Sequence, residues 1–244
     1  MPSNYRRKKS TTAVALKPVA SMSTNSSPKP FATASTITSS PNKEAAATKS
    51  SNDWKLPTVL PKIVIFDLDN TLWTPELYQI RQRQCPTPGK EISLFSDVPA
   101  ILRVLQQSKK SNPTILAIAS RTNKGEWARQ LLQDFNLDGT SLDCMFPQQE
   151  IFTGSKKEHM ANLKKKTGVD YNEMVFFDDD ERLNLKEISQ QLGMLCGHCP
   201  KGMTMALFQK TMDRYAGLAA QGDESSWRGE IVKAHAAPPK GAIV

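Results

Sequence analysis

Short apolar runs that end directly in polar or acidic side chains recur along this chain, and they constrain its fold more than any other feature. The run KIVIF at 62–66 leads into Asp67, TILAIA at 114–119 leads into Ser120, and MVFF at 174–177 leads into three successive aspartates. An apolar run without alternation is typical of a strand covered on both faces, as in a parallel sheet. With the weaker runs DCMF and MLCGHC, the predicted strands are 62–66, 114–119, 143–146, 174–177 and 194–199.

Segments with helical spacing lie between these strands. Ser155 and Glu158 form a capping box at one helix start, Asn123 and Glu126 form a candidate second box, and Ser96 is the predicted cap of a third helix. Strands that alternate with helices predict an α/β fold, here a Rossmann-like three-layer sandwich with a five-stranded parallel sheet. The predicted helices are 97–110, 124–135, 156–167, 181–192 and 204–219.

Composition divides the chain into one folded domain with two tails. Residues 1–56 are rich in Ser, Thr and Ala, and we expect a disordered tail or an organelle transit peptide. Residues 57–222 form the predicted domain, and residues 223–244 form a flexible C-terminal tail. The first 50 residues hold eight basic groups and one acid, so they carry most of the net charge of +8. Because the rest of the chain is nearly neutral, we expect no nucleic-acid partner.

The sequence also bears on compartment. No stretch of 18 or more apolar residues occurs, so neither a transmembrane helix nor a membrane partner is expected. Four unevenly spaced cysteines do not form a disulfide framework, which favours a reducing compartment. We therefore predict a cytoplasmic protein, with organelle targeting by the N-terminal 50 residues as the alternative.

Polar groups suited to phosphoryl transfer follow the predicted strands. Ligands of parallel sheets bind beyond the carboxyl ends of the strands, where Asp67, Asp69, Ser120 and the acids at 178–180 would converge with Lys156 at a helix start. A carboxylate can attack phosphorus, provided that a cation such as Mg²⁺ screens its repulsion from the phosphate. A second carboxylate can transfer protons, while a hydroxyl and an ammonium group hold the phosphoryl oxygens.

Four segments resemble the four motifs of the haloacid dehalogenase (HAD) superfamily of phosphatases: IVIFDLDNTLW, LAIASRT, TGSKKEHM and VFFDDDERLN. The Trp after the first motif, the SRT and the FPQQEIFTGSK run resemble the magnesium-dependent phosphatase-1 family in particular. The resemblance covers about residues 60–217 and implies an HAD fold. Only 25 residues separate Thr71 from the helix at 97, and 35 separate Ser120 from Lys156, so no large cap domain fits.

The resemblance also implies roles for individual residues. Asp67 would be the nucleophile and a metal ligand, and Asp69 the general acid/base and a metal ligand. Lys156 would neutralise charge, and Ser120 would bind the phosphoryl group. The other implied positions are Thr71, which would orient the loop and contribute to substrate binding; Arg121 and Trp73, at the substrate entrance; and the pair Asp178 and Asp179, which would complete the Mg²⁺ site.

The third acid at 178–180 leaves two alignments open. Related sequences read FFDDERRN, with one residue fewer before the Asn. The metal-binding pair is therefore Asp178 and Asp179 if the strand is aligned, or Asp179 and Asp180 if Asn184 is aligned. Because both alignments include Asp179, it is the preferred side-chain ligand.

These observations favour a Mg²⁺-dependent phosphomonoester hydrolase that forms an aspartyl-phosphate at an open site. The resemblance implies a phosphorylated protein or a small phosphorylated metabolite as partner, either phosphotyrosine on proteins or sugar and glycated-amine phosphates. One alternative is a non-catalytic phosphate-binding module. Another is a thiol oxidoreductase that uses Cys196 and Cys199 of the CGHC motif.

Overall fold

The computed structural model describes residues 54–108, 113–222 and 227–233, and the N-terminal segment 1–53 and residues 234–244 lie outside this part. Its main element is a six-stranded sheet with the order β10-β9-β8-β1-β4-β7, in which every described pair of strands is parallel. The strands are β1 (Ile63–Phe66), β4 (Ile115–Ser120), β7 (Gln148–Ile151), β8 (Met174–Asp178), β9 (Leu195–His198) and β10 (Ile231–Lys233).

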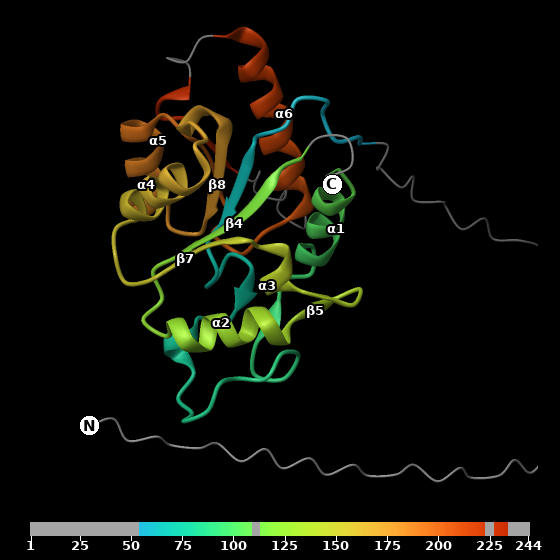
Figure 1. Cartoon of the computed structure of the whole chain (residues 1–244), viewed down its shortest axis with the longest axis vertical. Coiled ribbons are helices and arrows are strands. Elements are labelled where there is room, and N and C mark those ends of the chain that lie inside the picture. Colours follow the sequence, from blue (N-terminus) through green and yellow to red (C-terminus); the bar gives the residue numbers. More distant parts are fainter. Residues whose placement is uncertain (1–53, 109–112, 223–226, 234–244) are drawn as a thin grey trace, which may run out of the picture. The chain divides into compact units, whose positions relative to one another are not determined.

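Helices cover both faces of the sheet, as the predicted three-layer sandwich requires. One face of β1 presents Val64 and Phe66 to a core shared with α1 (Val98–Ser108) and α6 (Met205–Gln221). The other face presents Ile63 and Ile65 to a core shared with α4 (Lys156–Thr167) and α5 (Lys186–Leu192). Figure 1 shows these two pairs of helices on opposite sides of the strands. Burial on both faces explains why the central strands read as continuous apolar runs.

The sheet differs from the prediction at both edges. It has six strands rather than five, because residues 231–233, which we assigned to a flexible tail, pair with β9 as β10. DCMF at 143–146 is not a strand, since α3 (Leu142–Met145) occupies it, with Ser141 accepting a hydrogen bond from the Cys144 backbone N–H. The strand follows as β7, with the partly polar sequence QQEI. β7 was misplaced because an edge strand needs less apolar sequence, and β10 was missed because it has only three residues.

Helix starts confirm one capping prediction and contradict another. Ser155 and Glu158 form the complete capping box of α4. In contrast, α2 (Gly125–Asp134) follows Lys124, with no side-chain cap. A π-helical turn, Glu181–Leu185, precedes α5. The remaining short elements are β2 (Trp73–Thr74), β3 (Ser93–Leu94), β5 (Asn136–Leu137), β6 (Thr140–Ser141) and the 3-10 turns Leu77–Gln79 and Tyr171–Glu173.

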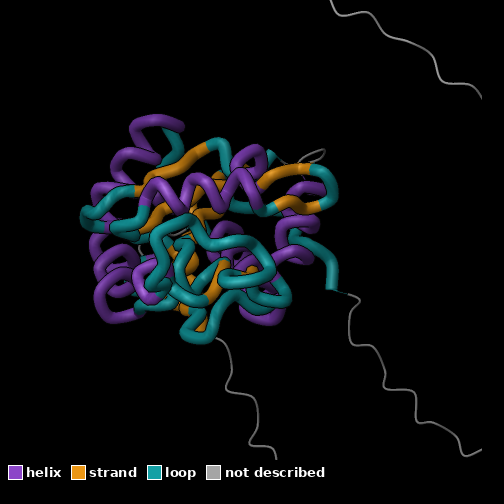
Figure 2. The backbone as a smooth tube through the Cα atoms, turned by 90° about the horizontal axis from the view of Figure 1, so that it is seen from below, coloured by secondary structure: helices purple, strands orange, loops and turns teal. Residues whose placement is uncertain are grey.

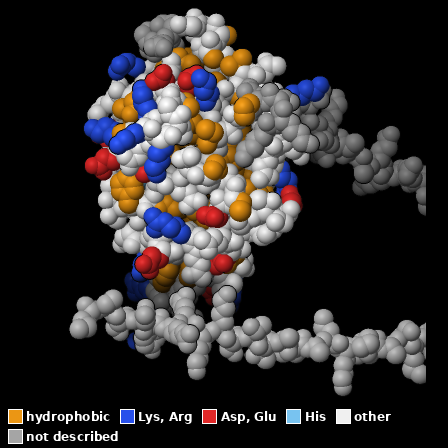
Figure 3. All heavy atoms as spheres, in the orientation of Figure 1, with side chains coloured by type: hydrophobic (Ala, Val, Ile, Leu, Met, Phe, Trp, Pro, Cys, Tyr) orange, Lys and Arg blue, Asp and Glu red, His pale blue; other side chains and the backbone are white. Residues whose placement is uncertain are grey.

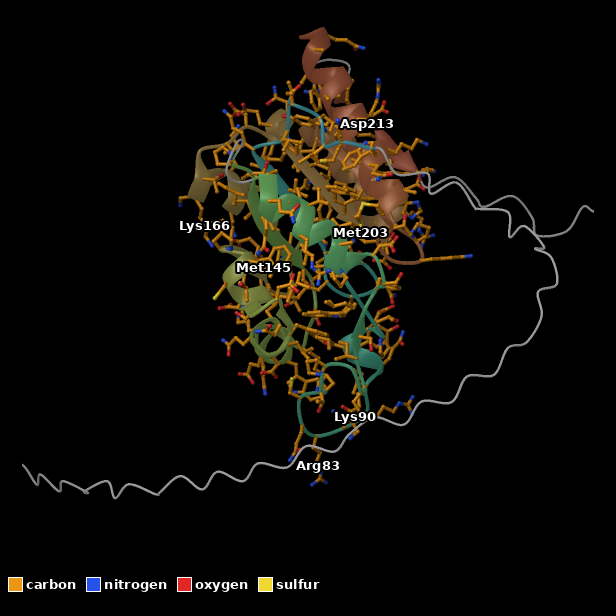
Figure 4. All side chains as sticks on the ribbon, turned by 90° about the vertical axis from the view of Figure 1, so that its right-hand side faces the viewer. Arg83, Lys90, Met145, Lys166, Met203 and Asp213 are labelled. Carbon is orange, nitrogen blue, oxygen red and sulfur yellow. The ribbon has the colours of Figure 1, made fainter. Side chains whose placement is uncertain are left out.

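A loop between β1 and α1 occupies the carboxyl end of the sheet without forming a cap domain. Within the described part of the chain this loop contains only a 3-10 turn and the small ribbon of β2 and β3. Figure 2 looks onto this end, where loops fill much of the view, and Figure 4 shows Arg83 and Lys90 at its outer tip. Within the described ranges no large cap lies over the strand ends, in agreement with the prediction.

Two further features of the described residues concern membrane-spanning helices and the distribution of surface charge. None of the helices in these ranges is long and apolar enough to cross a membrane. On the face drawn in Figure 3, basic and acidic side chains are interspersed.

Candidate active site

A cavity of about 430 Å³ opens at the carboxyl ends of the central strands. Sheet register explains its location: Phe66 of β1 pairs with both Ile118 of β4 and Phe177 of β8, so the residues after them emerge at the same level. The predicted residues that line the cavity are Asp67, Asp69, Ser120, Arg121, Lys156 and Asp179.

A buried ammonium group joins two carboxylates at the floor of this cavity. The Nζ atom of Lys156 lies 2.6 Å from Oδ1 of Asp67 and 3.0 Å from Oδ2 of Asp178, and it also donates to the Ala119 carbonyl. Burial would lower the pKa of Lys156, but the two carboxylates raise it above its usual value. Burial raises the pKa of Asp67, and Lys156 opposes that change. Lys156 therefore stays protonated and holds Asp67 in place.

Asp69 is oriented by a neighbouring indole. Trp73 donates from Nε1 to Oδ1 of Asp69 at 2.7 Å, and the Leu77 backbone N–H donates to the same oxygen at 3.3 Å. Burial raises the pKa of Asp69, although these hydrogen bonds oppose the rise. A carboxyl group with a raised pKa is suited to carry a proton. The prediction that Trp73 borders the substrate entrance is wrong, because its side chain is fully buried and stacks on Phe135.

The three successive aspartates have three different surroundings. Asp178 is fully buried and accepts hydrogen bonds from Asn184 Nδ2, besides its contact with Lys156. Asp180 caps the following turn by accepting from the Leu183 backbone N–H. Asp179 faces the cavity, and burial together with Asp178 raises its pKa to about 6. The prediction of Asp178 as a metal ligand is therefore corrected, and Asp179 is the ligand candidate of this loop.

The remaining predicted residues differ in access to the cavity. Ser120 lines it at the end of β4, and Arg121 is exposed at its rim, where Nη1 donates to Asn184 Oδ1. Thr71, in contrast, is fully buried and does not line the cavity. Its hydroxyl accepts a hydrogen bond from Cys199 Sγ, and its carbonyl accepts from the Met203 backbone N–H. Thr71 thus orients the loop after β1, and its predicted contact with substrate is corrected.

Several site residues were not predicted. His159 lies fully buried beneath Ser120, with its ring nitrogens 3.1 Å from the Ser120 carbonyl oxygen and 2.7 Å from that of Ser155. The ring stacks on Phe152, with 4.0 Å between centroids. His159 could have been predicted from its position three residues after Lys156, which places both side chains on one face of the helix. The unpredicted residues that line the cavity are Glu76, Tyr78, Thr122, Asn123 and Asn184, and Asp180, the alternative ligand of the second alignment, lines it as well.

The two cysteines of the CGHC motif lack the surroundings of a reactive thiol. Cys196 and Cys199 are both buried, and burial raises the pKa of each thiol above its usual value. Cys196 lies within β9 and Cys199 directly after it, whereas a helix N-terminus would be needed to favour the thiolate. This geometry argues against the thiol oxidoreductase alternative.

The carboxylates at the cavity fit a divalent cation that prefers oxygen ligands. Within the described ranges, no three His, Cys, Asp or Glu side chains are gathered so that they would hold a metal ion by themselves. Mg²⁺ does not need such a group, because one or two carboxylates bind it together with waters and phosphate oxygens. Burial and the neighbouring Asp178 raise the pKa of Asp179, and a bound cation would oppose both effects by favouring the carboxylate. Asp67 and Asp179 would supply carboxylates to Mg²⁺, and Asp69 would contribute its backbone carbonyl, as the family resemblance implies.

Comparisons by sequence with known proteins agree with this chemistry. The model of the Acid Phosphatase family matches residues 59–217. The chain is 35% identical to human magnesium-dependent phosphatase 1 over 170 residues, which cover 64% of this chain and 88% of the human protein. It is 36% identical over 142 residues to a HAD-like hydrolase superfamily protein of Schizosaccharomyces pombe, covering 50% of this chain and 77% of that protein. A solved structure of a HAD-like hydrolase from Xanthomonas campestris matches with a TM-score of 0.46 and 9% identity, over 66% of this chain and 99% of that one.

Proposed function

Because this chain belongs to the acid phosphatase family of the HAD superfamily, we propose that it is a Mg²⁺-dependent phosphomonoester hydrolase that works through an aspartyl-phosphate. The observation that carries the proposal is the placement of Asp67, with one carboxylate oxygen 2.6 Å from the Lys156 ammonium at the floor of an acid-lined cavity. A buried carboxylate held in this way has one oxygen fixed and the other available to attack phosphorus.

The first half of the reaction transfers the phosphoryl group to the protein. Asp67 attacks phosphorus and forms the acyl phosphate, while the bond to the leaving oxygen breaks. Asp69, oriented by Trp73, gives its proton to that oxygen, as its raised pKa allows. Lys156 and the Ser120 hydroxyl stabilise negative charge on the phosphoryl oxygens.

The second half releases phosphate. Asp69, now a carboxylate, removes a proton from water, which attacks the phosphorus of the aspartyl-phosphate and regenerates Asp67. When bound, Mg²⁺ screens the repulsion between the carboxylates and the phosphoryl oxygens. Asp178 takes no direct part, since its oxygens are engaged by Lys156 and Asn184.

We propose two substrate classes for this site, which are phosphotyrosine on proteins and small sugar or glycated-amine phosphates. Both are compatible with a cavity that has no cap domain over it in the described residues. Tyr78, whose side chain is 61% exposed at the cavity, offers an aromatic surface beside the phosphoryl site. Turnover of phosphotyrosyl peptides compared with a panel of small phosphorylated metabolites distinguishes the two classes.

Metal removal tests the proposed chemistry directly. Hydrolysis of a generic aryl phosphate should stop in EDTA and return with added Mg²⁺, and Asp67→Asn should remain inactive at every Mg²⁺ concentration. Undiminished turnover in EDTA would contradict the metal, and normal turnover by Asp67→Asn would contradict the nucleophile. Phosphate binding without turnover by the wild-type protein would instead favour the non-catalytic module.

We also propose a cytoplasmic location, with organelle targeting by the N-terminal 50 residues as the alternative. The basic, Ser-rich and acid-poor composition of this segment supports the alternative. Sequencing the N-terminus of the protein isolated from its native cells separates the two, because a transit peptide would be missing.

A further inference from the structure

The CGHC motif has no role in the proposed reaction, yet it lies directly beside the site. Cys196 to His198 belong to β9, which pairs with β8 so that His198 stands opposite Asp178. The chain then turns through residues 199–202 and enters α6 after Met203. We call residues 198–203 the clasp, because its contacts reach both loops that carry the catalytic aspartates.

The clasp holds the loop after β8 by two hydrogen bonds to backbone carbonyls. Nε2 of His198 lies 3.0 Å from the Asp179 carbonyl oxygen, and the Cys199 backbone N–H donates to the Asp178 carbonyl at 3.1 Å. Since a carbonyl oxygen only accepts, Nε2 of His198 carries the proton in this contact. The peptide group that follows the Asp179 side chain is thereby fixed.

The same segment holds the loop after β1. The Sγ of Cys199 donates to the Thr71 hydroxyl at 3.7 Å, and the Met203 backbone N–H donates to the Thr71 carbonyl at 3.0 Å. Thr71 lies two residues after Asp69. The clasp therefore links the loop of Asp67 and Asp69 to the loop of Asp179 through short contacts.

A second set of contacts fixes the His198 ring from outside. Its Nδ1 lies 3.4 Å from Glu181 Oε2, and Lys233 of β10 lies 2.9 Å and 2.7 Å from the two oxygens of Glu181. His198 itself is only partly exposed, with 17% of its side chain accessible. The imidazole is thus held between the metal loop and the last described strand.

We propose that His198 is a positioning residue that aims Asp179 at the divalent cation, and that the clasp sets the separation of the two acidic loops. The proposal rests on the proposed function, since it requires Asp179 to be a ligand. Residues that orient metal ligands from behind typically change metal affinity by about ten- to a hundredfold when they are replaced. Loss of the hydrogen bond from Nε2 releases the carbonyl end of the Asp179 peptide, while the Asp180 N–H still donates to Asp178 Oδ1 at 2.8 Å. Asp179 can then shift relative to the cavity without the loop unfolding.

Two substitutions of the same charge separate this role from a merely structural one. In His198→Gln the amide nitrogen takes the place of Nε2, so the bond to the Asp179 carbonyl is kept. In His198→Asn the amide nitrogen takes the place of Nδ1, so that bond is lost while the contact with Glu181 is kept. Mn²⁺ binding to the full-length protein, followed by the paramagnetic resonance of free Mn²⁺, and competition by Mg²⁺ report affinity without turnover. Thermal unfolding in EDTA checks that both variants are folded.

We expect His198→Asn to bind Mn²⁺ and Mg²⁺ about tenfold more weakly than the wild-type protein, and His198→Gln to bind within twofold of it. Equal loss in both variants, or no loss in His198→Asn, overturns the proposal. Asp179→Asn is the reference variant that distinguishes a wrong metal site from a wrong role of His198. If it binds metal as the wild-type protein does, the metal site of the proposed function is wrong and this inference falls with it. If it loses metal while His198→Asn does not, only the inference falls.

Discussion

The floor and the rim of the cavity are built differently. At the floor, Lys156, Asp67 and Asp178 are nine-tenths or more buried and joined by contacts of 2.6 and 3.0 Å. At the rim, Arg121 and Tyr78 are exposed, Arg121 in the loop after β4 and Tyr78 in the 3-10 turn Leu77–Gln79. Buried, mutually bonded charges have one arrangement, whereas exposed side chains adapt to what binds. The floor thus fixes the type of reaction, and the rim leaves the choice of substrate open.

This contrast predicts that substitutions at the floor remove activity against every substrate, while those at the rim change only the preference among substrates. The following predictions test the contrast, from the largest expected effect to the smallest.

The nucleophile provides the largest effect. Asp67→Asn should reduce kcat about a thousandfold or more on aryl phosphates and phosphopeptides alike, because an amide cannot form the acyl phosphate. Steady-state hydrolysis of both substrate classes measures it. Asp170→Asn, at an exposed carboxylate paired with Lys164, is the matched control and should keep full activity. A loss confined to one substrate class would break the contrast.

Lys156 should affect both activity and folding. Lys156→Met leaves the carboxylates of Asp67 and Asp178 buried without their counter-charge, and breaking such a pair costs about 3–5 kcal/mol. We expect urea denaturation to show that loss together with loss of turnover. Lys157→Met, whose side chain is 40% exposed, is the control and should change stability little. Equal stabilities of the two variants would show that the floor is not tightly coupled.

Replacing Asp179 should stabilise the fold, whereas replacing Lys156 should destabilise it. Burial and Asp178 raise the pKa of Asp179 to about 6 from its usual 3.8, so the ionised group destabilises the metal-free fold above pH 6. This cost is full above pH 6 and disappears as pH falls below about 4. In EDTA at pH 8, Asp179→Asn should therefore be about 1–3 kcal/mol more stable than the wild-type protein, though inactive. Urea denaturation at pH 8 and near pH 4 measures it, and a stabilisation independent of pH would contradict the assignment.

The sequence predicted the centre of the molecule better than its margins. The central strands are buried on both faces, so β1, β4 and β8 appear as unbroken apolar runs followed at once by the site residues. The edge strand β7 carries polar side chains and was misplaced, and the edge strand β10 has only three residues and was missed. Polar sequence at a sheet edge does not differ from a loop until the pairing partner is known.

At the site, residue types were predictable but side-chain directions were not. Three adjacent aspartates cannot be told apart by spacing, yet they differ in the structure. Asp178 points to Lys156 and Asp179 faces the cavity, whereas Asp180 lies at the cavity with its carboxylate capping a backbone N–H. Trp73 was assigned to the entrance because it follows the first motif. Tight turning after β1 instead buries its ring and aims the indole N–H at Asp69. Directions of this kind depend on long-range packing, which no local pattern records.

Trp73 extends the comparison to a residue that does not touch the cavity. Trp73→Phe keeps the ring stacked on Phe135 but removes the donor to Asp69, so we expect kcat to fall about tenfold on every substrate. Trp127→Phe, at a partly buried indole on α2, is the control. Steady-state kinetics with two unrelated phosphate esters measures the effect. A change in KM for one ester alone would place Trp73 with the rim rather than the floor.

Replacing Tyr78 should give the smallest effect on activity, and the effect should depend on the substrate. Because its side chain is 61% exposed, Tyr78→Ala should cost less than about 0.5 kcal/mol in stability. If the aromatic surface contacts the substrate beyond its phosphate, kcat/KM for a phosphotyrosyl peptide should fall by about two- to tenfold, since aromatic pairs contribute about 0.5–1.5 kcal/mol. The value for a small sugar phosphate should stay the same. Tyr171→Ala, at a partly buried tyrosine held by Lys164 away from the cavity, controls for loss of an aromatic side chain elsewhere. An equal fall in kcat/KM for both substrates would mean that Tyr78 acts on the chemical step. Tyr78 would then belong to the floor of the cavity rather than to its rim.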